Sequence, residues 1–122
     1  MTAIKGSCHC GAVTFEYPET PEKLTACNCT LCRRIGGLWA YAPKNQIKLN
    51  MPTDGMIRYV QGDKMLATCS CKTCGCTTHW EPIQDTADDA RMAVNMRMAD
   101  PKDIEGVRIR RFDGFDTWTF LD

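Results

Sequence analysis

Apolar and polar residues alternate along short stretches of this chain, most clearly over residues 12–17 and 93–98. The side chains of a β-strand point alternately to its two faces, so this period of two predicts strands. Further short strands are predicted over residues 38–42, 57–60, 65–69, 77–80, 107–112 and 115–120. Gln61-Gly62-Asp63-Lys64 separates two of them and predicts a hairpin turn. Helix is expected only near residues 30–35 and 101–104.

Short strands with at most short helical turns indicate an all-β, or β-dominated, fold. A chain of 122 residues has the length of one domain, so we expect residues 1–122 to fold as a single unit. Lys plus Arg and Asp plus Glu both number 15, which gives a formal net charge of zero. A nucleic-acid-binding protein would need a basic excess, and no apolar stretch is long enough to span a bilayer. We therefore expect neither a nucleic acid nor a membrane as partner.

Cysteine is the residue type that carries most of the chemical information. Most of the nine cysteines form Cys-x-Cys pairs, namely Cys8/Cys10, Cys27/Cys29, Cys69/Cys71 and Cys74/Cys76, and Cys32 stands alone. In an extended backbone, residues i and i+2 point to the same face, so such a pair places two sulfurs side by side. The two-residue spacings of Cys29/Cys32 and Cys71/Cys74 suit a turn that closes on one cation. Zinc is bound by thiolates in this kind of tetrahedral arrangement, so we predict zinc as the cofactor.

Disulfide bonding and redox chemistry are the two alternatives to zinc. Small secreted domains carry as many cysteines in disulfides, but residues 1–6 contain no apolar signal-peptide core, and the odd cysteine count leaves one thiol over. A redox Cys-x-x-Cys normally opens a helix after a strand, whereas Gly75 and Cys76 follow Cys71-Lys72-Thr73-Cys74 at once. Free thiols and the absence of a targeting segment predict a reducing, cytoplasmic location.

One group of cysteines has the composition of a closed metal site. Cys8 and Cys10 offer two ligands, and a structural zinc site is usually four-coordinate, so a second pair is required. The natural partners are Cys71 and Cys74, which the short turn between them brings together.

Cys27, Cys29 and Cys32 then form a separate group of three. Three protein ligands leave one coordination position open, which is the general mark of a catalytic zinc. Water or the thiolate of a substrate could take that position, because thiolate is a soft ligand that suits zinc. Arg33 and Arg34 follow directly and could attract an anionic substrate, although ordinary solvated surface charge is an equal interpretation of them.

Three motifs together resemble the glutathione-dependent formaldehyde-activating enzyme family, whose domain centromere protein V shares. They are Gly6-Ser7-Cys8-His9-Cys10-Gly11-Ala12-Val13, Cys27-Asn28-Cys29-Thr30-Leu31-Cys32-Arg33-Arg34 and Cys71-Lys72-Thr73-Cys74-Gly75. The motifs keep the family's order, and with residues 95–100 and 113–122 the resemblance covers nearly the whole chain. The combination is specific, whereas any one motif alone would be weak.

The resemblance implies a fold of several small, coiled antiparallel sheets with two zinc ions per chain. It implies that a structural zinc is held by Cys8, Cys10, Cys71 and Cys74, and a catalytic zinc by Cys27, Cys29 and Cys32. The implied reaction joins glutathione and formaldehyde to give S-hydroxymethylglutathione, a carbon–sulfur bond-forming step classed with the lyases. Glutathione, or a similar small thiol, is therefore the expected substrate, with Arg33 and Arg34 as its candidate contacts.

Two other functions stay open at this point. Both zinc ions could be structural within a protein-binding module, in which case a fourth protein ligand would close the three-cysteine site. A thiol or metal sensor could instead use the spare thiols of Cys69 and Cys76. These two cysteines could also replace Cys71 or Cys74 as ligands, although we favour their interpretation as small buried side chains beside the site.

Overall fold

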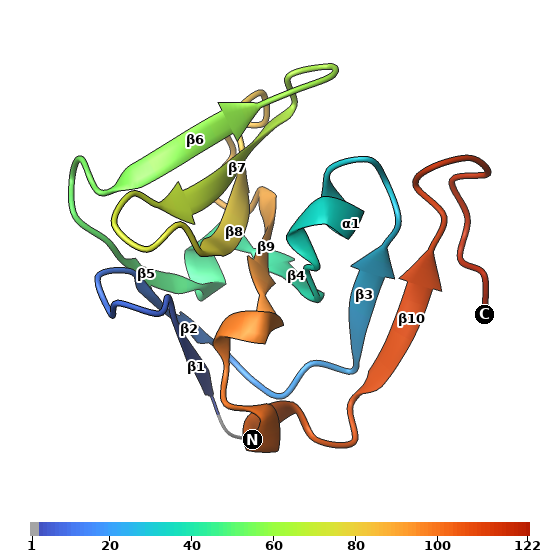
Figure 1. Ribbon diagram of the computed structural model, residues 1–122, viewed down its shortest axis with the longest axis horizontal. Coiled ribbons are helices and arrows are strands. Elements are labelled where there is room, and N and C mark those ends of the chain that lie inside the picture. The colour runs from blue at the N-terminus through green and yellow to red at the C-terminus, as the bar shows by residue number, and fades with distance from the viewer. Residues whose placement is uncertain (1–2) are drawn as a thin grey trace.

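A computed structural model describes residues 3–122 and is dominated by β-strands. The strands form one sheet of three and one of seven, so the predicted β-dominated fold class is confirmed. Figure 1 shows the small sheet near the N-terminus, β6 to β8 at one end of the large sheet, and β3 with β10 at the other. The short helix α1 follows directly on β3, where the second cysteine motif lies.

The three-stranded sheet is antiparallel and places the first cysteine pair. β1 (Ile4–Ser7) and β5 (Lys48–Asn50) flank β2 (Thr14–Tyr17). Gly6 lies opposite Phe15, and a Cβ on Gly6 would overlap the ring of Phe15. The buried ring can therefore lie across β1 only because that position has no side chain. The connection from β1 to β2 carries Cys8 and Cys10.

The seven-stranded sheet has the order β10-β3-β4-β9-β8-β7-β6. Its strands in chain order are β3 (Lys23–Cys27), β4 (Trp39–Pro43), β6 (Met56–Val60), β7 (Leu66–Cys71), β8 (Thr77–Pro82), β9 (Arg91–Asn95) and β10 (Arg108–Phe112). β6 and β7 form the predicted hairpin, with Val60 opposite Ala67. β10 runs parallel to β3 and places Phe112 opposite Cys27. This parallel pair brings the segment after β10 to the second cysteine group.

The helical segments are short. They are α1 (Cys32–Ile35) and the 3-10 turns η1 (Lys44–Gln46), η2 (Met96–Met98) and η3 (Pro101–Ile104). Two of them, α1 and η3, lie where the sequence predicts helical turns. Gly36 ends α1 with a φ of 72°, a left-handed conformation that favours glycine. Between residues 3 and 122, no helix is both long enough and apolar enough to cross a membrane.

Two predicted strands differ from the structure. The strand predicted over residues 93–98 ends at Asn95, because the Asn95 side chain accepts the N–H of Arg97 and begins η2. The strand predicted over residues 115–120 is wrong, since the Asp113 carboxylate accepts the N–H groups of Asp116 and Thr117 and bends the chain. Only a single bridge, from Phe112 to Phe120, remains of it in the described chain. The sequence pattern did not predict β1, β3 or β5.

The main hydrophobic cluster joins the two sheets. Phe15 from β2 packs in the same cluster as Leu24 from β3 and Met92 and Val94 from β9, all at most 3% exposed. Full burial of such a side chain contributes roughly 1.5–3 kcal/mol. A second, smaller cluster consists of Cys8, Val13 and Cys71, with Met56, Cys74 and Cys76 packed against it. Three of the four cysteines predicted to hold the structural zinc, Cys8, Cys71 and Cys74, therefore belong to a small core of their own, whereas Cys10 is exposed.

Candidate metal centres

The sulfur atoms of Cys8, Cys10, Cys71 and Cys74 all lie within 4.8 Å of one another. The Sγ atoms of Cys8 and Cys10 are 3.7 Å apart, and those of Cys10 and Cys71 are 3.6 Å apart. Four sulfurs bound tetrahedrally to zinc at about 2.3 Å would be separated by roughly 3.8 Å. The spacing of these thiols therefore fits a tetrahedral four-sulfur site, which we call the four-sulfur group.

Two tight turns form the four-sulfur group. Cys8 and Cys10 lie on the turn after β1, where the N–H of Val13 donates to the Cys8 sulfur at 3.3 Å. Cys71 ends β7, and its N–H donates to the carbonyl of Cys76, while the N–H of Gly75 donates back to Cys71. Adjacent sulfurs thus come from turns that close on themselves, rather than from the extended backbone that the sequence suggested for Cys8 and Cys10.

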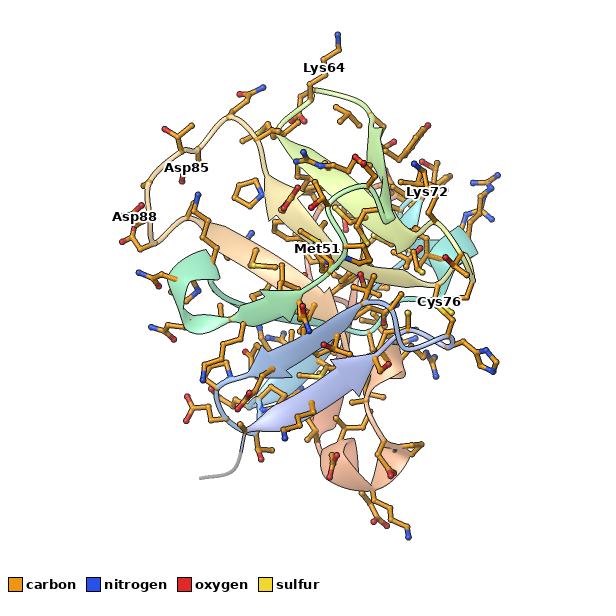
Figure 2. The ribbon with its side chains drawn as sticks, turned by 90° about the vertical axis from the view of Figure 1, so that its left-hand side faces the viewer. Met51, Lys64, Lys72, Cys76, Asp85 and Asp88 are labelled. Carbon is orange, nitrogen blue, oxygen red and sulfur yellow. The ribbon has the colours of Figure 1, made fainter. Side chains whose placement is uncertain are left out.

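Backbone N–H groups favour the thiolate form in this group. The N–H groups of Cys76 and Cys10 lower the pKa of Cys74 to about 5. The N–H groups of Cys74 and Thr73 likewise lower the pKa of Cys71. Metal ligation requires deprotonated cysteine, so these donors prepare the two thiols to bind a cation. Figure 2 shows Cys76 where the turn between β7 and β8 meets the connection between β1 and β2.

The second set, which we call the three-sulfur group, consists of Cys27, Cys29 and Cys32, with sulfurs within 4.8 Å of one another. Cys27 ends β3 and Cys32 begins α1, so strand end and helix start converge on one point. The N–H of Cys29 donates to the Cys27 sulfur at 3.4 Å, and the N–H of Cys32 to the Cys29 sulfur at 3.2 Å. All three residues are half-buried, so the group remains accessible from solvent.

Charge is unevenly distributed over the three-sulfur group. The hydrogen bond from Cys32 and the N–H of Cys29 lower the pKa of Cys27 to about 6. The same bond to Cys27, together with burial, raises the pKa of Cys32. Of this hydrogen-bonded pair, Cys27 is therefore the thiol whose deprotonated form is favoured. Such an electron-rich set of sulfurs is a ready cation site.

A loop after β10 closes over the three-sulfur group. Asn28, which lies between two of the cysteines, donates from Nδ2 to Asp113 at 3.0 Å and accepts the N–H of Phe115 at 3.0 Å. The Thr117 N–H, the Asn28 amide and the Thr117 hydroxyl lower the pKa of Asp113 to about 2. A Cβ on Gly114 would lie 2.7 Å from the sulfur of Cys27. Asn28, Asp113 and Gly114 were not predicted as site residues, and Asp113-Gly114 was the available signal for a turn.

A surface cleft of about 620 Å³ lies beside α1. It is lined by Arg34, Ile35, Gly36, Gly75, Cys76, Thr77, Asn95, Arg97 and Met98. Arg97 donates from Nε to the carbonyl of Gly36, and the buried Asn95 amide donates to Thr77 and accepts the N–H of Leu38. Hydrogen bonds therefore join η2 to the C-terminal end of α1, and β9 to β8, around this cleft.

The predicted arginines lie differently with respect to this cleft. Arg34 lines it, and its guanidinium donates to the carbonyl of Thr30 at 2.6 Å. Arg33 is exposed on the same helix and is not among the lining residues. Arg97 is a second lining cation, so the cleft carries positive charge from two elements.

The two remaining cysteines lie outside both sulfur groups. Cys69 is 1% exposed on β7, and burial raises its pKa to about 12. Cys76 is half-buried against the four-sulfur group and lines the cleft. His79, 0% exposed on β8, has its pKa lowered to about 4, mainly by burial, so its ring is neutral.

Comparison with known proteins gives three related findings. Residues 3–109 match the family model described as glutathione-dependent formaldehyde-activating enzyme. A curated protein of Halomonas elongata, named "Putative glutathione-dependent formaldehyde-activating enzyme", is 42% identical over 40 residues. That match spans 32% of this chain and 26% of the relative, about a quarter of its length. A crystal structure of a Rhodobacter sphaeroides protein superposes with a TM-score of 0.68 at 28% identity, covering 87% of this chain and 99% of the other.

Proposed function

We propose, from the premise that this chain belongs to the glutathione-dependent formaldehyde-activating enzyme family, that it joins glutathione and formaldehyde to give S-hydroxymethylglutathione. The activity would be that of a zinc-dependent carbon–sulfur lyase. The observation that carries the proposal is the three-sulfur group at the start of α1, a single helical turn whose residues Arg34 and Ile35 line a cleft that Arg97 of η2 also lines. We propose one domain over residues 1–122, and nine free thiols support a reducing compartment such as the cytoplasm.

Zinc is the ion that we propose for both sulfur groups. The sulfur spacings of the four-sulfur group support a structural ion held by Cys8, Cys10, Cys71 and Cys74. Cys27, Cys29 and Cys32 would hold the second ion through three ligands. Bound there, zinc would supply the Lewis acidity that favours the thiolate form of a thiol at neutral pH.

The residues of the cleft bind and orient the substrate in this proposal. Glutathione carries two carboxylates, and a guanidinium pairs with a carboxylate through two parallel hydrogen bonds. Arg34 and Arg97 provide these cations at the cleft wall, and Arg33 provides a further one on the exposed side of α1. In the reaction a carbon–sulfur bond forms, the carbonyl π bond breaks, and the thiol proton ends on the aldehyde oxygen. Holding the thiol in place lowers the entropic barrier to that step.

Calorimetry with glutathione and S-methylglutathione tests this proposal. Both ligands keep the carboxylates, but the methylated one lacks the ionisable thiol, so it should bind far less well to the zinc-loaded protein. Arg34→Ala should weaken glutathione binding about tenfold while zinc content is unchanged, because one charge-assisted contact is lost. Lys64→Ala is the matched control, since Lys64 lies at the tip of the β6–β7 hairpin (Figure 2).

Two results would contradict the proposal. Equal affinity for the two ligands would show that the thiol does not meet the metal. Absence of binding by either ligand would favour a zinc-stabilised protein-binding module instead.

A further inference from the structure

A third group of side chains of metal-ligand type, separate from both sulfur groups, lies on β7 and β8. The side-chain ligand atoms of Cys69, His79 and Glu81 lie within 4.8 Å of one another. Cys69 is directly opposite His79 in the antiparallel pair, and Glu81 follows two residues later on the same face of β8. The strand register thus gathers a sulfur, a nitrogen and an oxygen at one place.

His79 presents an unused ring nitrogen in this group. The ring is fully buried, and its Nδ1 shares a hydrogen bond of 2.8 Å with the hydroxyl of Thr78. Its Nε2 is buried without a hydrogen-bond partner. A buried polar atom without a partner destabilises the folded protein, because it has lost its hydrogen bonds to water and forms none within the protein. When Nδ1 donates its proton to Thr78, Nε2 carries a lone pair, which is the arrangement of metal-binding histidines.

Arg58 closes the group on the solvent side. It lies opposite Cys69 on the edge strand β6, and its guanidinium forms an ion pair with the Glu81 carboxylate. The side chain of Arg58 is 53% exposed, whereas that of Glu81 is 23% exposed. Since ion pairs near the surface contribute little to stability, Arg58 can turn into solvent at small cost. The Glu81 carboxylate then lacks a cationic partner, and a metal cation can take the place of the guanidinium.

We propose that Cys69, His79 and Glu81 form a third divalent-metal site, which a cation enters when Arg58 leaves Glu81. Thiolate, imidazole and carboxylate are the three ligand types that zinc accepts, and three protein ligands leave one position for water. Cobalt(II) binds similar sites and reports on them by absorption. With one thiolate instead of three or four, this site is expected to fill after the two sulfur groups.

Metal titration followed by cobalt(II) absorption and by total metal analysis tests the proposal. The wild-type protein should take up a third equivalent after the thiolate-rich sites are filled. Glu81→Gln removes the anionic ligand at a partly exposed position and should abolish that equivalent while preserving the first two. Arg58→Gln should bind the third equivalent about tenfold more tightly, because it removes the competing charge. Lys64→Gln, which removes a positive charge from the hairpin tip, is the matched control.

Two outcomes would overturn this inference. One is a third equivalent that is missing from both the wild type and Arg58→Gln. The other is a third equivalent that persists unchanged in Glu81→Gln. The test is independent of the proposed enzyme activity, because Cys27→Ser should impair glutathione binding and the second equivalent while the third remains.

Discussion

Replacement of Gly114 by alanine tests how closely the loop after β10 covers the three-sulfur group. The added Cβ would lie 2.7 Å from the Cys27 sulfur and 3.2 Å from the Cys29 Cβ. The first distance is shorter than packed atoms allow, so either the loop or the sulfur must move. In the metal-free protein the Cys27 side chain can rotate away. A bound ion would hold that sulfur in place, so the strain would fall on the metal-loaded state.

The size of the effect follows from the cost of overpacking, which is about 1–3 kcal/mol for one added methyl group in a well-packed site. Because each 1.4 kcal/mol changes an equilibrium tenfold, zinc should bind the three-sulfur group roughly 5- to 150-fold more weakly. None of the three atoms nearest to the added Cβ belongs to the four-sulfur group, so the affinity of that group for zinc should not change.

Competition with a chromophoric chelator can resolve the two classes of zinc in Gly114→Ala and the wild type. Phe115→Ala is the matched control, because Phe115 is the next residue on the same loop and its side chain is 67% exposed. Wild-type affinity in Gly114→Ala would refute the argument that the loop presses on the Cys27 sulfur. Weaker binding at both classes would show that the substitution disturbs the whole fold instead.

Three further predictions concern folding and pH. Cys8→Ser should abolish most folded, soluble protein, because a structural zinc contributes directly to the free energy of folding, whereas Cys27→Ser should retain the fold. An equal loss of the circular dichroism signal in both variants would contradict the assignment of a structural role to one site and a catalytic role to the other. Asn95→Ala should lower the free energy of unfolding, measured by urea titration, by about 3 kcal/mol, because the buried Asn95 amide forms three hydrogen bonds with backbone groups. The control Asn45→Ala changes an exposed residue and should alter the free energy of unfolding little. The pKa of Asp113 is about 2 in the folded protein and about 3.9 when unfolded, so its stabilisation is complete above about pH 5 and fades toward pH 2. The stability difference between the wild type and Asp113→Asn should therefore shrink as the pH falls, and a constant difference from about pH 6 to pH 3 would disprove the role of that charge.

The β-rich character and the hairpin of β6 and β7 could be predicted because strand periodicity and turn residues are local properties of the sequence. β5 was missed since it has only three residues, too few to show a period. The strand predicted over residues 115–120 was wrong. Apolar and polar residues do alternate there, but the N–H groups of Asp116 and Thr117 donate to the Asp113 carboxylate instead of to a neighbouring strand. A side chain that competes with the sheet for N–H groups leaves little trace in a hydrophobic pattern.

The proximity of the sulfurs within each cysteine group could be predicted from sequence, because the short spacings within each motif hold them close together; that each group binds zinc stays a prediction. The surroundings of the groups could not be predicted. The cover over Cys27 depends on a parallel strand pair between residues far apart in the chain, and no local pattern specifies that pairing. Arg97 reaches the cleft through a hydrogen bond to Gly36, which likewise depends on the tertiary fold. His79 offered no signal beyond its residue type, since its unpaired nitrogen is a property of the folded protein.

The pairing of β10 with β3 also has a kinetic consequence. Phe112 lies opposite Cys27, so this contact closes the long stretch of chain between them into a loop. Contacts between distant residues form late, because closing a long loop reduces chain entropy before any contact compensates for it. During synthesis, Cys8 to Cys74 leave the ribosome well before residues 108–112. A nascent chain can therefore complete the four-sulfur group while the three-sulfur group still lacks its cover, which orders the assembly of the two sites in time.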